Sequence, residues 1–111
     1  MGYAVALLLT LAVEIPIYAI GLHTLLGEPM SHGMIAGCAV NLTHPLAFLV
    51  GMPLLIDTRD YGATLAVVEL AVWIAEAALL WIWFRREPGI LLALSLVANG
   101  TSLCVGLFTL R

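Results

Sequence analysis

Lysine is absent from this sequence, and charged residues of every kind are scarce. Only 10% of the 111 residues are charged, and all four basic side chains other than histidine are arginines. A water-soluble domain carries about 25% charged residues. The net charge is −3 and the arginines form no basic patch, so we expect no nucleic acid partner.

Motifs that would indicate particular chemistries are also missing. The sequence has no glycine-rich phosphate-binding loop. It has no Glu-x-x-His pair of the kind that binds two irons in soluble helical bundles. Its two cysteines, Cys38 and Cys104, lie in apolar segments, at depths that we expect to differ by more than about 15 Å. A disulfide needs Cα atoms within about 7 Å, so we expect none within the chain.

Apolar residues dominate the composition. They make up 63% of the chain, against about 45–50% in soluble domains. Four segments have the roughly 20 apolar residues that a membrane-spanning helix needs, and short breaks rich in glycine, proline or charge separate them. They cover residues 3–26, 33–56, 63–84 and 89–110. The sequence therefore predicts an all-α integral membrane protein, a four-helix bundle with short loops that forms one transmembrane domain over residues 1–111.

Charge near the ends of the spans says little about orientation. The first segment has no positive charge near its start and carries Glu14, so we expect a retained helix and not a cleaved signal peptide. Two arginines, Arg59 and Arg111, lie on one expected side, and Arg85 and Arg86 lie on the other. This balance permits an antiparallel dimer, or a fixed topology set by a partner. We expect a homo-oligomer or a subunit of a membrane complex.

Polar and small residues inside the spans are few, and in each span they share one helix face. Spacings of three, four and seven residues place them in four stripes. The stripes, with the larger residues that continue them, are Thr10, Glu14, Tyr18 and Gly21; Gly33, Gly37, Asn41, His44, Phe48 and Gly51; Glu69, Trp73, Glu76 and Leu80; and Ser95, Asn99, Ser102 and Gly106. This pattern predicts a bundle whose polar faces turn inward, away from lipid.

Several of these side chains are expected at one depth. At about 1.5 Å per residue, Glu14, His44 and Asn99 lie about 16–18 Å from the side that carries the chain ends. This is near the middle of a hydrocarbon core about 30 Å thick. Glu69 and Glu76 fall on either side of that level, at about 10 and 21 Å. Three carboxylates, one imidazole and one carboxamide are therefore predicted to meet near mid-membrane.

Intramembrane carboxylates need compensation. Each costs about 2.5–3.5 kcal/mol at the bilayer centre, so three that faced lipid would cost about 8–10 kcal/mol. This is comparable with the whole stability of a small domain. We therefore expect the glutamates to face inward and not all to be ionised. No intramembrane arginine or lysine can neutralise them, so protons, a histidine, polar donors or a bound cation must do so.

The candidate site consists of these side chains. We predict that a proton or cation binds to Glu14, His44, Glu69 and Glu76. The supporting polar side chains are Asn41, Ser95, Asn99 and Ser102. The ligating set also suits a divalent metal ion as a cofactor, because imidazole with carboxylates binds zinc, manganese or iron. The alternative is that each polar residue only holds helices together by hydrogen bonds.

Two prolines lie near the same level. Pro45 cannot donate a backbone hydrogen bond to the carbonyl of Asn41, so it should disturb the second span. Pro16 should free a carbonyl near Ala12 in the first span in the same way. Loosened helices beside polar side chains are typical of ion and substrate sites in transporters.

Two families are similar to this chain. The segments "VEIPIYAIG", "NLTHP" and "LVANGTS", with Glu69 and Glu76, resemble a group of small prokaryotic four-span membrane proteins without an assigned activity. That resemblance covers nearly the whole chain and implies no known activity. We expect the protein to be integral to the bacterial inner membrane. The size, the short loops and the glutamate in the first span are similar to small multidrug resistance transporters. In that family the matching glutamate, here Glu14, exchanges protons for cationic drugs. The tryptophan and glycine motif of its third span is absent, so drug export is not transferred to this chain.

Three functions remain open from the sequence. The first is a small transporter, channel or receptor subunit whose polar centre binds a proton or cation. The second is a structural or assembly subunit of a larger membrane complex, held in place by its polar stripes. The third is an intramembrane enzyme that uses a metal ion to activate water.

Overall fold

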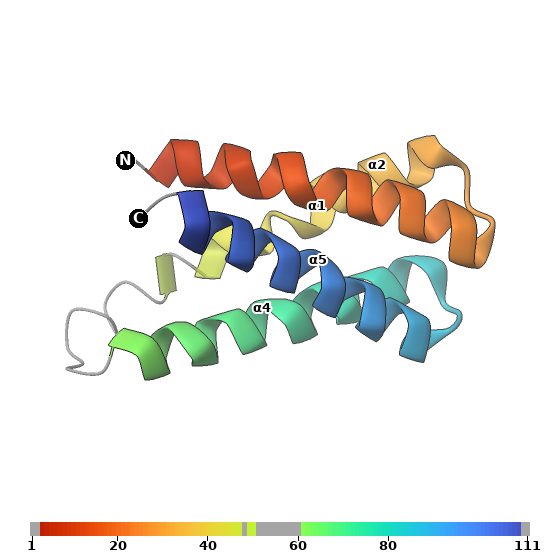
Figure 1. The fold of residues 1–111 in the computed structure, drawn as a ribbon. Coiled ribbons are helices and arrows are strands. Elements are labelled where there is room, and N and C mark those ends of the chain that lie inside the picture. The colour runs from red at the N-terminus through yellow and green to blue at the C-terminus, as the bar shows by residue number, and fades with distance from the viewer. Residues whose placement is uncertain (1–2, 48, 51–60, 110–111) are drawn as a thin grey trace.

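The computed structural model describes residues 3–47, 49–50 and 61–109, and the regular structure in these ranges is entirely helical. The helices are α1 (Tyr3–Leu26), α2 (Met30–Val40), α4 (Tyr61–Phe84) and α5 (Pro88–Thr109) (Figure 1). Three of them, α1, α4 and α5, contain stretches long and apolar enough to cross a membrane. The predicted helical class is confirmed, and the chain is a small membrane protein.

Three of the four predicted spans match observed helices closely. The first has the predicted bounds, and α4 and α5 each begin within two residues of the predicted start. The second span was predicted as one helix over residues 33–56, and this is wrong within the described residues. Its helix begins earlier, at Met30, and ends at Val40, and residues 43–47 form a separate helical segment. Residues 51–56 of that prediction lie outside the described residues.

The turn after α1 is closed by backbone hydrogen bonds. Gly27 has a φ of +70°, and its N–H donates to the carbonyl of His23 at 3.1 Å. The N–H of Glu28 donates to the carbonyl of Leu22, also at 3.1 Å. This is the Schellman pattern, in which a residue in the left-handed region, best filled by glycine, ends a helix. The turn sends the chain back along α1, so α1 and α2 lie antiparallel.

A single arginine ties this turn to the one between α4 and α5. The Arg86 guanidinium donates to the carbonyl of Leu26 and to Oε1 of Glu28, both at 2.6 Å. The two turns therefore lie together at one end of the molecule. The start of α1 and the end of α5 lie at the other end (Figure 1).

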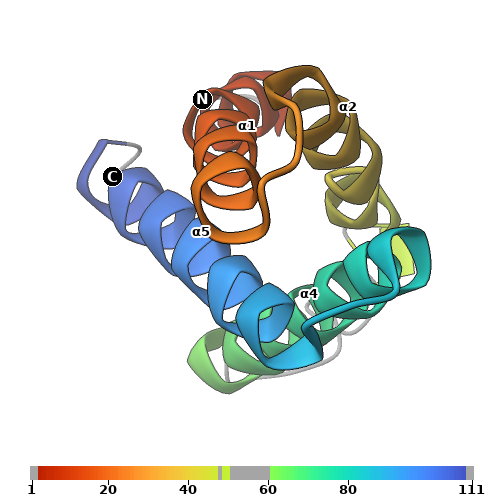
Figure 2. The ribbon, with the colours of Figure 1, turned by 90° about the vertical axis from the view of Figure 1, so that its right-hand side faces the viewer.

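The helices form an incomplete ring when viewed along the bundle from the turn end (Figure 2). Helix α1 packs against α2 and α5, and α5 packs against α4, while α2 and α4 make only slight contact. Glycines allow the close approach of α2 to α1. A Cβ atom added to Gly33 would lie 2.7 Å from Cα of Ala19, a distance that packed atoms do not tolerate.

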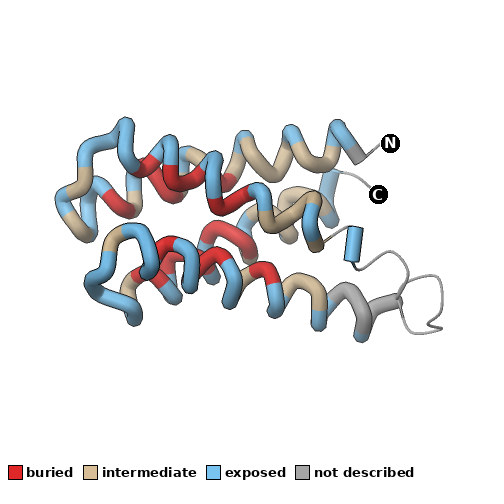
Figure 3. The backbone as a smooth tube through the Cα atoms, turned by 180° about the vertical axis from the view of Figure 1, so that it is seen from behind, coloured by how far each residue is buried: buried red, intermediate tan, exposed pale blue. Residues whose placement is uncertain are grey.

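Buried residues occupy the facing sides of the helices, most densely in the half nearer the turns (Figure 3). This half holds an apolar core. Its members are Tyr18, Leu22, Ala36, Val40, Leu80, Leu91, Leu94 and Ala98. Buried polar side chains adjoin the core, namely Glu14, Asn41, Glu76, Ser95 and Asn99. The prediction that these polar residues face inward is confirmed.

Candidate functional site

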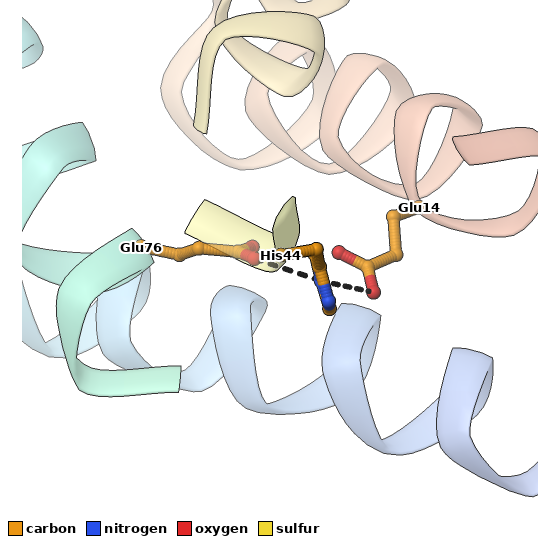
Figure 4. Close-up of side chains that lie close together, drawn as sticks. All are labelled: Glu14, His44 and Glu76. Atoms are coloured by element: carbon orange, nitrogen blue, oxygen red, sulfur yellow. Dashed lines mark ion pairs between the residues drawn. The ribbon is translucent and has the colours of Figure 1, made fainter. Parts of the chain in front are cut away.

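Two glutamates and a histidine from three segments of the chain meet inside the bundle. Glu14 comes from the middle of α1, Glu76 from α4, and His44 from the helical residues that follow α2. Nε2 of His44 lies 3.4 Å from Oε2 of Glu14 and 3.2 Å from Oε2 of Glu76. Figure 4 shows the imidazole between the two carboxylates. Both glutamate side chains are fully buried, and that of His44 is 16% exposed.

The interruption after α2 determines where His44 lies. Asn41 caps the helix, and its side-chain Nδ2 donates to the carbonyl of Gly37 at 2.6 Å. Pro45 has no N–H to donate to the carbonyl of Asn41. That carbonyl accepts a hydrogen bond from the N–H of His44 instead, at 3.1 Å. The carbonyl that Pro45 leaves without its usual helical donor is therefore not a free acceptor. A tight turn satisfies it and begins the segment that carries His44.

Glu76 is held by three neighbouring side chains. Its Oε1 accepts hydrogen bonds from the Tyr18 hydroxyl at 2.5 Å and from Nδ2 of Asn99 at 3.2 Å. The Thr43 hydroxyl donates to its Oε2 at 3.0 Å, and lies 2.8 Å from the carbonyl of Val40 as well. Because the donors come from α1, α5 and the segment after α2, they fix this carboxylate from three sides.

Glu14 has a much sparser environment. The Ser102 hydroxyl donates to its Oε2 at 2.5 Å, and also lies 3.1 Å from the carbonyl of Asn99. The other oxygen, Oε1, is buried and has no hydrogen-bond partner. A buried acceptor without a donor costs about 1–3 kcal/mol. Glu14 therefore has one oxygen beside His44 and a second that is open to a further partner.

The imidazole faces both carboxylates but forms a hydrogen bond to neither. Nε2 of His44 lies within ion-pair distance of both, yet its geometry satisfies no hydrogen bond. Buried Oδ1 atoms of Asn41 and Asn99 also lack partners. Each asparagine donates from Nδ2 to the carbonyl four residues earlier, so its Oδ1 is the side-chain atom left without a hydrogen bond. Unpartnered polar atoms thus concentrate around this group.

Several predicted site residues have other positions or roles. Glu69 is half-buried and lies outside the group formed by Glu14, His44 and Glu76, whose ligating atoms lie within 4.8 Å of one another. It precedes Glu76 by seven residues, two helical turns. The hydroxyl of Ser95 donates to the carbonyl of Trp73 at 3.0 Å and so joins α5 to α4.

Pro16 does not interrupt the first span, and Gly106 does not pack closely against another described helix. Helix α1 is continuous through Pro16. Gly106 belongs to the stripe expected to face inward, but among the described residues outside its own helix nothing lies within 4 Å of a Cβ added there. The α5 stripe acts instead through Asn99 and Ser102, which reach the glutamates by hydrogen bonds.

Sequence reasoning missed two donors at the site. Tyr18 was placed on the polar face of the first span, but its hydroxyl was not expected to bind Glu76, 58 residues away. Thr43 was not considered, although it immediately precedes His44. The available signals were the one-turn spacing of Tyr18 from Glu14 and the position of Thr43 beside the histidine.

Comparison of the chain with protein families, with curated proteins and with solved structures finds no match. What the chain can do must therefore be argued from the site. Two carboxylates and one imidazole, shielded from lipid, can bind protons or a cation.

Proposed function

We propose that this membrane protein is a small transporter, channel or receptor subunit that binds a proton or cation at Glu14, His44 and Glu76. The observation that carries the proposal is the fully buried pair of carboxylates on either side of one imidazole. Helices α1, α2, α4 and α5 contain no arginine or lysine to balance them. An unbalanced charge in the bilayer centre costs about 2.5–3.5 kcal/mol even by the most permissive measure.

Charge balance suggests what occupies the site. Two ionised carboxylates carry two negative charges, and a neutral imidazole adds none. Two protons, one on His44 and one on a glutamate, make the group electroneutral, and so does one divalent cation. The two states exclude each other because they use the same atoms. The site would therefore exchange protons for a cation without a net change in buried charge.

The interrupted second segment supports a transport role. Transporter sites are often built where a membrane helix is broken and its backbone turns beside polar side chains. Here the break at Asn41 precedes His44 by three residues. In the proposed arrangement the segment after α2 completes a fourth span, and the site lies near the bilayer midplane. The proposed setting is the bacterial inner membrane, with the chain in a homo-oligomer or a membrane complex.

The test is flux through purified protein in liposomes. A proton gradient should drive cation movement, and uptake should rise with pH on the loading side because protons compete for the ligand atoms. Glu14→Gln and Glu76→Gln should reduce flux at least tenfold. Glu87→Gln removes an exposed carboxylate outside the proposed site, and should keep flux within about twofold of the unchanged protein.

The result that would contradict this function is equally definite. Folding would be followed by circular dichroism and by elution as a single species. If folded Glu14→Gln and Glu76→Gln proteins bound and moved cations like the unchanged protein, the site would have no such role. Loss of a co-purifying partner in these variants, with no binding in any form, would instead favour an assembly subunit.

A further inference from the structure

We infer that the cation is a divalent transition metal ion of the zinc, manganese or iron class, bound directly by Glu14, His44 and Glu76; this inference rests on the proposed cation-binding function. It names the substrate class of the site. The argument uses the donor atoms, their spacing, their charge and the hydrogen bonds around them.

The donor set is the first argument. One imidazole nitrogen and two carboxylate oxygens suit the first-row metals, for which histidine is a common ligand. Calcium takes six to eight oxygen ligands, and magnesium keeps several waters in an octahedral arrangement. Glu14, His44 and Glu76 form the group of potential metal ligands that the described residues provide here. Two carboxylates and an imidazole are a poor match for either of the hard cations.

The spacing of the donors is the second argument. Zinc binds nitrogen and oxygen at about 2.0–2.2 Å, so two ligands at tetrahedral angles lie about 3.3 Å apart. Nε2 of His44 lies 3.4 Å from Oε2 of Glu14 and 3.2 Å from Oε2 of Glu76. These two separations match edges of such a site, and all three ligand atoms lie within 4.8 Å of one another.

The charge is the third argument. A divalent ion with two carboxylates and a neutral imidazole forms an electroneutral group, which lowers the cost of burial in lipid. With His44 neutral, a monovalent ion would leave one negative charge uncompensated, and a protonated His44 could not act as a ligand. Helices α1, α2, α4 and α5 supply no lysine or arginine to compensate that charge.

The surrounding hydrogen bonds are the fourth argument. Oε1 of Glu76 accepts two hydrogen bonds, from Tyr18 and Asn99, whereas Oε2 accepts one, from Thr43, so Oε2 is the oxygen with room for a metal ion. Oε1 of Glu14 is buried without a partner, so Glu14 can add a second oxygen. Hydrogen-bonded neighbours that orient ligands in this way typically change metal affinity about 10–100-fold when they are removed. Tyr18 and Ser102 are thus positioning residues. When Glu14 binds through one oxygen only, a coordination position is left open for water or a second ligand.

The experiment measures binding of single metals to detergent-purified protein after chelator treatment. Mn²⁺, Zn²⁺, Co²⁺, Ca²⁺ and Mg²⁺ would each be titrated by calorimetry, and Co²⁺ also by its visible absorption. We expect one Co²⁺ per chain, with the intense bands of a low-coordinate site. Zn²⁺ should displace it, and Ca²⁺ and Mg²⁺ at a hundredfold higher concentration should not. His44→Gln should weaken binding about 100-fold or more.

Matched controls separate ligand loss from general damage. Glu87→Gln and His23→Gln remove the same side-chain types at exposed positions outside the site and should leave affinity within about threefold. Tyr18→Phe should weaken binding about tenfold and alter the Co²⁺ bands, which a purely structural role would not do.

The outcomes distinguish the inference from the function on which it rests. If calcium, magnesium or a monovalent ion bound at these residues and the transition metals did not, the inference would fail and cation binding would stand. Proton-driven flux without any bound metal ion would overturn the inference and leave a proton site. Because the spectrum of the unchanged protein reports on the ligands, an unstable His44→Gln variant would not prevent a decision.

Discussion

Pro16 and Pro45 occupy comparable places in two neighbouring apolar segments, yet only one segment is interrupted. Helix α1 runs from Tyr3 to Leu26 through Pro16 without a break. In the second segment the regular helix stops at Val40, five residues before Pro45. A missing N–H is therefore not enough to end a helix here, and the interruption needs a further cause.

The further cause is the side chains around Pro45. Asn41 donates from Nδ2 to the carbonyl of Gly37, so its side chain and its backbone N–H share one acceptor. Asparagine and threonine side chains compete in this way with the helical backbone pattern. Thr43 similarly lies 2.8 Å from the carbonyl of Val40. The residues around Pro16 are Glu14, Ile15, Ile17 and Tyr18, and the polar side chains among them reach other segments instead.

This difference gives the two segments different tasks. The continuous helix α1 places Glu14 and Tyr18 on one helix face. The interrupted segment turns Thr43 and His44 toward the glutamates of α1 and α4. If the comparison is right, four substitutions should have graded effects.

The largest effect is expected where the two segments touch. A Cβ in Gly33→Ala would lie 2.7 Å from the Cα of Ala19, so the helices must move apart. Overpacking of this kind costs about 1–3 kcal/mol. The thermal unfolding midpoint in detergent should fall clearly. Gly100→Ala is the control, because no described residue lies within 4 Å of a Cβ added there. Equal midpoints for the two variants would show that the glycine contact contributes nothing.

Removal of the second proline comes next. Pro45→Ala restores an N–H that can donate to the carbonyl of Asn41 in a regular helix, in competition with the turn to His44. Cation affinity should fall about tenfold as His44 shifts, which corresponds to about 1.4 kcal/mol. Hydrogen exchange at His44 and Leu46 should slow. Unchanged affinity and exchange would mean that the proline does not maintain the interruption.

A smaller effect is expected from the asparagine. Asn41→Ala removes the side-chain hydrogen bond to the carbonyl of Gly37, worth about 0.5–1.5 kcal/mol. Because Pro45 remains, the turn should persist, with one fewer hydrogen bond to stabilise it. Cation affinity should therefore fall about three- to fivefold. A loss as large as that of His44→Gln would make Asn41 itself a ligand.

The smallest effect is expected at the first proline. Pro16→Ala restores a donor to a helix that is already continuous, and the Pro16 side chain is exposed. Affinity should stay within about twofold, and the unfolding midpoint should rise or remain the same. A fall in affinity equal to that of Pro45→Ala would remove the distinction between the two segments.

Particular residues show how far sequence reasoning reached. The inward faces of Glu14, Glu76 and Asn99 followed from helical spacing and from the cost of polar groups in lipid. The same spacing placed Glu69 on the face of Glu76 and could not show that only Glu76 approaches His44. Disturbance of the second span near Pro45 was predicted, but its position at Asn41 was not, because side-chain competition for backbone acceptors depends on local geometry. The Tyr18 contact to Glu76 joins residues 58 positions apart, and no local pattern contains it.

The sequence alone determined the helical class, the bounds of three long apolar helices and the inward direction of most polar side chains. Lipid allows little else, because backbone groups must bond within the segment and carboxylates must turn from the hydrocarbon. Only the tertiary structure decided which carboxylates share the imidazole, and which oxygen of each is left open. Those choices depend on how closely α2 approaches α1 at Gly33 and on where the second segment breaks, and neither distance is contained in a helical repeat.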